Sequence, residues 1–132
     1  MDASVALKWV LPEPGSEAAI ELLSQDALAA PDLFFVECAN VLWSKVRRGQ
    51  ITATEAQSAF AAIEATPIRG LSVRLHAAAA LAIAAELQQS AYDSLYLAAA
   101  IAEHAILVTA DELFAKAVRA HPVYANAIRP LG

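Results

Sequence analysis

The chain has 132 residues, of which 58% are hydrophobic and 17% are charged. This length is near the commonest size of one folded domain, and the composition excludes a disordered chain, so we expect a single domain over residues 1–132. The formal net charge of −5 argues against a nucleic-acid binder held by a broad basic surface. It does not exclude a nuclease, because a cluster of active-site carboxylates also contributes negative charge.

No membrane or secretion segment is predicted. The longest apolar run, residues 77–85, has nine residues, far below the roughly 20 that cross a bilayer. Lys8 and Glu13 interrupt any apolar region of a signal peptide. We therefore expect a cytoplasmic protein with no membrane partner. The single cysteine, Cys38, excludes an internal disulfide, and its apolar neighbours predict a buried, inert thiol.

In the first half of the chain, short strands alternate with helices. Residues 1–3 fit a strand end that leads into a short helix over residues 4–11. Ser16 is a suitable cap for a second helix that runs to about residue 25. Residues 28–30 form a plausible short strand, and residues 33–48 carry an apolar pattern of helical period.

The second half continues the alternation. Thr52 and Glu55 form a capping box that opens a helix to about residue 65. The Ala-rich residues 75–89 predict a helix that is well buried, and Ser90 can cap the helix that follows it. The remaining predicted elements are strands within residues 68–73, 105–109 and 127–129, and helices over residues 92–104 and 111–120.

Short apolar strands that alternate with helices indicate an α/β protein. Parallel neighbours need crossover connections, so the pattern favours a three-layer α/β/α sandwich with a mainly parallel central sheet. In sheets of this kind, functional sites form at the carboxyl ends of the strands.

Three acidic residues stand where an ordinary surface carboxylate is not expected. Asp2 lies where a strand hands over to a helix, Asp93 opens a helix whose next residues are apolar, and Asp111 follows the clearest apolar strand. The first turn of a helix offers free amide groups and the positive end of the helix dipole, which would help keep Asp93 ionised. The strand ends are therefore the expected place of the site.

Glu37 is a fourth such acid, embedded in the apolar helix over residues 33–48. Asn40 and Ser44 follow it at i+3 and i+7, so one polar stripe runs along a mostly apolar helix. A buried carboxylate must find a partner, take up a proton or bind a metal ion, and no Lys or Arg lies near it on this stripe. Carboxylates brought together repel one another, and a divalent cation is the simplest compensation.

An all-oxygen ligand set favours Mg²⁺ or Mn²⁺, which bind carboxylates together with substrate phosphate. Zinc is not expected, because the three histidines lack the spacing of a ligand set. The chemistry that follows is the cleavage of phosphodiester bonds. The predicted catalytic metal ligands are Asp2, Glu37, Asp93 and Asp111.

At these positions the sequence resembles the PIN-domain nucleases, and most closely the VapC toxins of bacterial toxin–antitoxin pairs. The resemblance covers nearly the whole chain and depends on four acidic motifs in a fixed order. They are DASVALKW from Asp2, ECANVL from Glu37, YDSLYLA around Asp93 and VTADELF around Asp111.

The resemblance implies a parallel α/β/α fold, a homodimer, inhibition by a small VapB-like antitoxin, and Mg²⁺- or Mn²⁺-dependent endoribonuclease activity. RNA as the substrate comes from the resemblance alone. The alternative is a non-catalytic PIN-like module that binds antitoxin or RNA, because a fold does not determine a function. The family normally has an apolar strand before the first Asp, whereas only Met1 precedes Asp2 here. We expect a shortened central strand, with the natural start upstream or the chain truncated.

Several secondary roles stay open in the sequence. Ser4, Asn40 and Thr109 either orient carboxylates or serve as ordinary helix caps. The cations at residues 45, 47 and 48 either contact RNA phosphates or stabilise the carboxyl end of their helix. Glu112 is an alternative to Asp111 at the fourth motif. The residues expected to pack in a core or dimer interface are Trp9, Trp43, Tyr92 and Tyr96.

Overall fold

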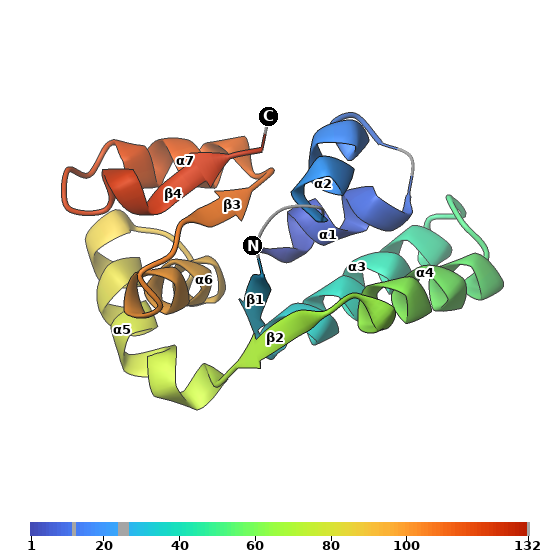
Figure 1. Cartoon of the computed structure of the whole chain (residues 1–132), viewed down its shortest axis with the longest axis horizontal. Helices are drawn as coiled ribbons and strands as arrows, with labels where there is room; N and C mark the ends of the chain where they lie inside the picture. Colours follow the sequence, from blue (N-terminus) through green and yellow to red (C-terminus); the bar gives the residue numbers. More distant parts are fainter. Residues whose placement is uncertain (12, 24–26, 132) are drawn as a thin grey trace.

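The computed structural model describes residues 1–11, 13–23 and 27–131. Its helices and strands alternate largely as the sequence predicts (Figure 1), so the chain is an α/β protein. The helices are α1 (Ala3–Val10), α2 (Ser16–Leu23), α3 (Leu33–Arg47), α4 (Ala53–Ala65), α5 (Val73–Leu87), α6 (Ala91–Ala102) and α7 (Glu112–Arg119), with a short 3₁₀ helix η1 (Ala125–Ala127). The strands are β1 (Leu28–Pro31), β2 (Ile68–Leu71), β3 (Leu107–Thr109) and β4 (Ile128–Pro130).

Polar residues fix the starts of several helices. The side chain of Thr52 accepts a hydrogen bond from the Glu55 amide at 3.1 Å, and Glu55 accepts one from the Thr52 amide at 3.0 Å, so the predicted capping box of α4 is confirmed. Ser90 caps α6 as predicted. The predicted end of α2 near residue 25 lies outside the described residues.

The strands form two parallel pairs rather than one continuous sheet. β1 pairs with β2 from Leu28↔Ile68 to Pro31↔Leu71, and β3 pairs with β4 from Leu107↔Ile128 to Thr109↔Pro130. The prediction of parallel pairing is confirmed. The prediction of a strand end at residues 1–3 is wrong, because Asp2 caps α1 and Ala3 is already helical.

Helices connect the two strand pairs and bury their apolar sides. α6 contacts both β1 and β3, while α1 contacts β3, α3 and α4. One core cluster joins Phe34 of α3, Ile63 of α4, Leu97 of α6 and Leu107 of β3, each at most 1% exposed. Cys38 lies in the same cluster, and burial raises the pKa of its thiol to about 12, as expected of an inert cysteine.

α5 departs from its predicted burial. Only Ala80 and Ile83 are buried on this helix, whereas Leu75 is 80% and Leu81 is 68% exposed. The prediction of a well-buried helix is wrong because α5 lies at the outside and packs mainly against α6 (Figure 1). Alanine forms helix readily without burial, so an Ala-rich sequence does not report which face is covered.

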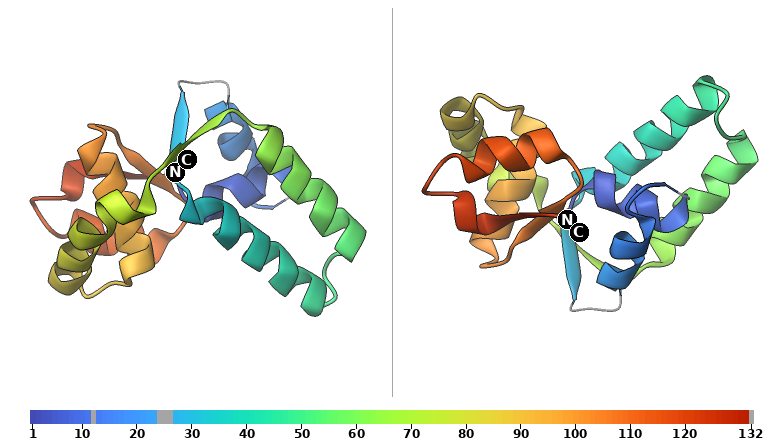
Figure 2. Two further views of the ribbon diagram at one scale, coloured as in Figure 1. Left: turned by 90° about the horizontal axis from the view of Figure 1, so that it is seen from below. Right: turned by 90° about the horizontal axis from the view of Figure 1, so that it is seen from above.

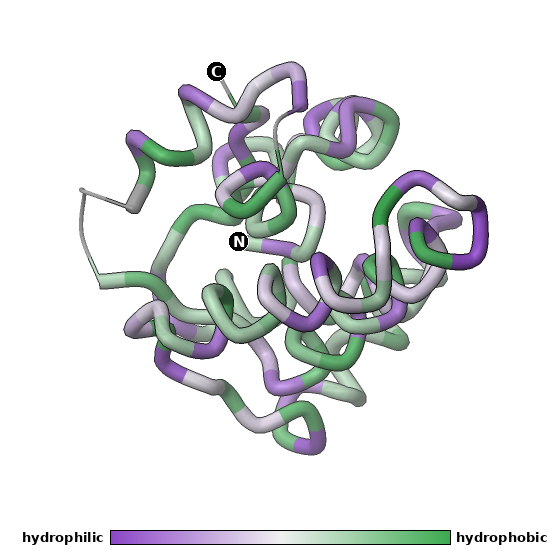
Figure 3. Tube along the Cα trace, turned by 90° about the vertical axis from the view of Figure 1, so that its right-hand side faces the viewer, coloured by the Kyte–Doolittle hydropathy of each residue, from purple (hydrophilic) through white to green (hydrophobic). Residues whose placement is uncertain are grey.

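α3 and α4 form an antiparallel hairpin that extends away from the strands (Figure 2). Hydrophobic and hydrophilic segments alternate along the helices (Figure 3), as expected where one face of a helix is buried. Across the described residues, no helix is both long and apolar enough to traverse a bilayer.

Candidate active site

Asp2 sits at the start of α1 and is tied to the carboxyl end of β3. Its Oδ1 accepts hydrogen bonds from the Ser4 amide at 3.2 Å and from the Ser4 hydroxyl, and its Oδ2 accepts one from the Thr109 hydroxyl. The Ser4 Oγ also accepts a bond from the Ala110 amide at 3.0 Å. Burial raises the pKa of Asp2, although these hydrogen bonds oppose the shift. Ser4 and Thr109 therefore orient the carboxylate of Asp2, which is one of the two roles predicted for them.

Glu37 lies on α3, and the buried Tyr96 of α6 donates its hydroxyl to Glu37 Oε1. Burial raises the pKa of Glu37, and the charges of Asp93 and Asp2 raise it further, while the Tyr96 bond lowers it. Tyr96 is 4% exposed, so its predicted place in the core is confirmed. Its hydroxyl contact with Glu37 was not predicted. The available signal was its position at i+3 from Asp93, on the same face of α6.

Removing the Tyr96 hydroxyl should raise the pKa of Glu37. Tyr96→Phe deletes a bond that favours the ionised carboxylate, and we expect a loss of stability of about 1 kcal/mol at a pH where Glu37 is ionised. An NMR titration of the Glu37 carboxyl measures the pKa. The matched control is Tyr124→Phe, whose hydroxyl bonds Glu86 at 3.0 Å instead. Equal Glu37 titrations in both variants would refute this role of Tyr96.

Asp93 stands in the first turn of α6, as predicted. The Asp93 amide donates to the Ser90 Oγ at 3.0 Å. Burial raises the pKa of Asp93, as do the charges of Asp111 and Asp2, whereas Ser90 lowers it. Ionising the Asp93 carboxyl group therefore costs free energy, and the Ser90 bond offsets that cost only in part.

Ser90→Ala should destabilise the protein by about 1 kcal/mol through loss of the helix cap and should raise the pKa of Asp93. Ser72→Ala is a matched control, because Ser72 caps α5 by accepting from the Leu75 amide at 3.3 Å. We expect a similar change in the free energy of unfolding, measured in urea, but an unchanged Asp93 titration. An Asp93 pKa that shifts in neither variant would show that Ser90 acts on the helix alone.

Asp111 follows β3 and caps α7, where its Oδ1 accepts from the Phe114 amide at 3.0 Å. The Asp111 amide donates to the Thr109 Oγ1 at 3.0 Å, so Asp111 and Asp2 share one threonine hydroxyl. The charge of Asp111 raises the pKa of Asp93, whereas Glu112 is not among the groups that do so. This electrostatic contact favours Asp111 over Glu112 as the fourth acid.

The four predicted acids come from separate segments and meet electrostatically. Glu37 is affected by Asp93 and Asp2, and Asp93 by Asp111 and Asp2. Within residues 1–11, 13–23 and 27–131, however, no three His, Cys, Asp or Glu side chains are close enough to form a metal-binding set. A carboxylate has about four lone-pair sites, so Asp2, Glu37 and Asp111 retain acceptor capacity beyond the bonds described. The donors are all oxygen, which suits a hard cation such as Mg²⁺.

The other polar residues on α3 and directly after it have different surroundings. Asn40 is exposed and lines a hollow of about 400 Å³ together with Glu37 and Tyr92. Lys45 forms an ion pair with Glu13 at 3.4 Å, and the Arg48 Nε donates to the Ser44 carbonyl at 3.3 Å. Lys45 and Arg48 therefore both have partners within the protein. Arg47 stacks over the Trp43 ring at 5.7 Å, and Trp43 is 55% exposed rather than in the core.

The protein is thus an α/β protein in which Asp2 and Asp111 lie beside the carboxyl end of β3 and raise the pKa of Asp93 on α6. Comparison with protein families gives a match to the PIN domain model over residues 1–120. The chain belongs to the PIN domain family. Its mixed helices and short parallel strands agree with the α/β/α fold of that family, and PIN domains are commonly nucleases. No curated protein sequence matches the chain.

Proposed function

We propose that this chain is a divalent-metal-dependent endoribonuclease of the VapC toxin type, held inactive by a VapB-like antitoxin. The observation that supports the proposal is the raised pKa of three acids that come from separate segments of the chain. Asp2, Glu37 and Asp93 are partly or largely buried, and burial raises the pKa of each. The charge of Asp2 raises the pKa of Glu37 and Asp93 further, and the charge of Asp93 raises that of Glu37. Perturbed titratable groups from several segments, gathered near strand ends, are typical of functional sites.

Mg²⁺ or Mn²⁺ fits the donor set, because the four acids offer only carboxylate oxygens. Among the described residues, the N-terminal ammonium lowers the pKa of Asp2, and no cation lowers that of Glu37 or Asp93. Asp2, Glu37, Asp93 and Asp111 would hold the ion. When bound, it would supply the positive charge that offsets the carboxylates and the Lewis acidity that polarises a phosphate.

The chain's own residues would prepare this site. Ser4 and Thr109 hold both oxygens of Asp2 in place, and Tyr96 holds Glu37 from the neighbouring helix. These bonds limit the rotation of the carboxylates, so less ordering remains to be done when a substrate phosphate arrives.

RNA could approach over the hollow that Glu37, Asn40 and Tyr92 line. Tyr92 is 63% exposed and neighbours Asp93 in the chain, so of its two predicted places, a core or a dimer interface, it does not occupy the core. An exposed aromatic ring beside a phosphate-cutting site offers a stacking surface for an unpaired base, a contact of about 1–3 kcal/mol in single-strand binding.

The proposal includes a homodimer and an antitoxin partner, with RNA cleavage in the cytoplasm. Its support is exposed apolar surface on this small chain. α3 and α4 border a groove of about 450 Å³ lined by Leu42, Trp43, Val46 and Phe60, and α5 exposes two leucines. Surface of this kind suits protein partners. Sedimentation should give twice the 13.9 kDa of the chain for the free toxin.

The test is cleavage of a diverse RNA panel by the purified chain. We expect cleavage with Mg²⁺ or Mn²⁺, none with chelator, and recovery when the metal ion is returned. Products should carry 5′-phosphate and 3′-hydroxyl ends. Cleavage that persists in chelator would refute the metal-dependent activity, and no cleavage of any RNA would favour a non-catalytic PIN-like module.

A further inference from the structure

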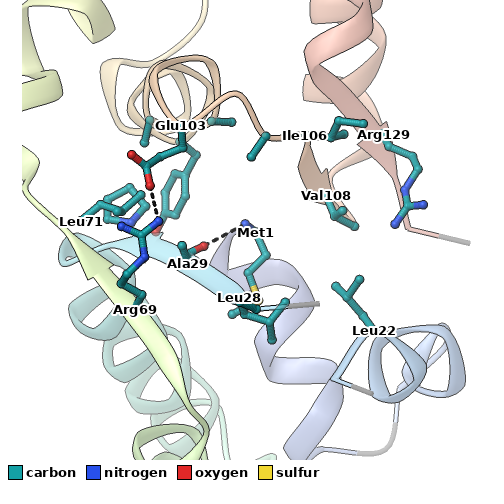
Figure 4. A pocket seen from close by; sticks show the side chains of 16 residues that line it. Met1, Leu22, Leu28, Ala29, Arg69, Leu71, Glu103, Ile106, Val108 and Arg129 are labelled. Atoms are coloured by element: carbon teal, nitrogen blue, oxygen red, sulfur yellow. Dashed lines mark hydrogen bonds and ion pairs between the residues drawn. The ribbon is translucent and has the colours of Figure 1, made fainter. Parts of the chain in front are cut away.

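Some of the positive charge of this acidic chain is neutralised by its own carboxylates. The chain has nine Lys and Arg residues, and three of them form ion pairs within the part of the chain that the structure describes. Lys8 and Lys45 both pair with Glu13, and Arg69 pairs with Glu103 (Figure 4). A polyanion that binds this protein must therefore be held by the remaining cations.

Most of the remaining cations lie away from the acids or face another cavity. Residues 47–48 lie at the end of the α3–α4 hairpin that extends away from the strands (Figure 2). Arg74 is in the first turn of α5, which lies at the bottom of Figure 1 while α7 lies at the top. Arg129 of β4 lines the cavity that is drawn in Figure 4. The last two, Lys116 and Arg119, share one helix, α7.

The exposed face of α7 carries both of these cations. Phe114, Ala115 and Val118 are buried and hold the helix against the core. Lys116 and Arg119 are three residues apart, so they lie on the same side of the helix, and both are exposed. Among the described residues, neither side chain has a hydrogen-bond or ion-pair partner. Both charges are therefore available to a ligand.

The two cations line a hollow of about 630 Å³ that adjoins the candidate active site. Its lining includes Glu112, which follows Asp111, and Pro130, which is paired in register with Thr109. The Thr109 hydroxyl is the group that bonds Asp2. The hollow therefore begins beside two of the four acids and continues along α7.

The charge along this face changes from negative to positive with distance from the acids. Glu112 stands at the end next to Asp111, and Lys116 and Arg119 follow it. At a rise of about 1.5 Å per residue, the two cations lie about 7 and 12 Å beyond Asp111 along the helix axis. A stacked strand carries one phosphate per about 3.4 Å, so both cations lie within about four nucleotides of a phosphate at the acids. This spacing suits a chain of phosphates better than one small anion.

We propose that the exposed face of α7 binds the phosphates of the RNA strand beside the cut, with Lys116 and Arg119 as positioning residues. This role rests on the proposed function, which supplies RNA as the substrate. Each cation neutralises a phosphate and releases the counterions held there, so the contact is independent of base sequence. The two side chains hold the strand in register and take no part in breaking the bond.

RNA binding in chelator, where no cleavage is expected, tests this face directly. The probe is a labelled single-stranded RNA of mixed sequence, and its affinity is measured at several salt concentrations. Arg119→Gln should reduce the slope of log affinity against log salt concentration by about 0.7, and Lys116→Gln/Arg119→Gln should reduce it by about 1.4. Arg74→Gln is the matched control, because it removes the same charge from an exposed arginine of α5, and it should leave the slope unchanged.

The kinetics of cleavage separate positioning from chemistry. In Mg²⁺, Lys116→Gln/Arg119→Gln should raise the KM for RNA about tenfold and change kcat by less than about twofold, because the phosphate contacts persist through the reaction. Lys116→Arg/Arg119→Lys keeps both charges and should behave as the wild type.

Three results would overturn this role of α7. They are equal slopes for Arg119→Gln and Arg74→Gln, a loss in kcat with KM unchanged, and a wild type that does not bind the RNA in chelator. Failure of the proposed function looks different, since the wild type would then bind RNA through α7, with the slopes given above, and cut none.

Discussion

Asp93→Asn should lower metal-dependent RNA cleavage by about 100-fold or more, the order of effect expected when one electrostatic group of a catalytic site is lost. Glu37→Gln should have a loss of the same order. Both substitutions keep the size of the side chain and remove its charge, so each takes one ligand from the proposed ion. The readout is the rate of RNA cleavage in saturating Mg²⁺ or Mn²⁺.

Loss of folding would not explain such a result. The pKa values of Glu37 and Asp93 are raised in the folded protein, so a neutral side chain at either position should leave the metal-free protein at least as stable as the wild type at pH 7. Glu64→Gln is the matched control, since Glu64 is exposed on α4. If Asp93→Asn retained the wild-type rate, the cleavage would not come from this site.

The second large effect is stabilisation by divalent cations. An ion that binds only the folded chain adds about 2.7 kcal/mol at a concentration 100-fold above its dissociation constant. We expect Mg²⁺ to raise the Tm of the wild type at constant ionic strength, and to leave that of a Glu37→Gln/Asp93→Asn double variant unchanged. An equal Tm shift in both proteins would locate the bound ions elsewhere.

The pH dependence of this stabilisation follows from the same pKa shifts. Asp2, Glu37 and Asp93 have raised pKa values, so the folded chain holds protons that the unfolded chain has already released. The stability of the metal-free protein should therefore fall as the pH rises from the ordinary carboxyl range through the raised values. The metal ion binds the ionised carboxylates, so its stabilising effect should grow over that same range.

Local signals in the sequence predicted the elements that carry the site. The capping box at Thr52 and the serine cap at Ser90 involve residues three apart, so the sequence alone specifies them. The helices that contain Glu37 and Asp93 were also predicted from local signals, because α3 and α6 have apolar patterns of helical period.

The contacts that complete the site are long-range and could not be predicted in this way. Tyr96 contacts Glu37 across 59 positions of the sequence, and Thr109 contacts Asp2 across 107. Helical or strand periodicity describes residues that are a few positions apart, so it does not predict such pairs. The division of the strands into two pairs is of the same kind, because strand partners depend on the whole topology. The exposure of α5 was misjudged since alanine suits both a buried and a solvated helix.

The central claim is that Asp2, Glu37, Asp93 and Asp111 together bind one catalytic divalent-metal centre. Crystals soaked in Mn²⁺, examined by anomalous diffraction, test it most directly. The account predicts an anomalous peak within about 2.0–2.3 Å of carboxylate oxygens from Glu37 and Asp93, joined by Asp2 or Asp111. A peak held by other residues, such as Glu86 with His121, or saturating Mn²⁺ with no peak among the four acids, would contradict it.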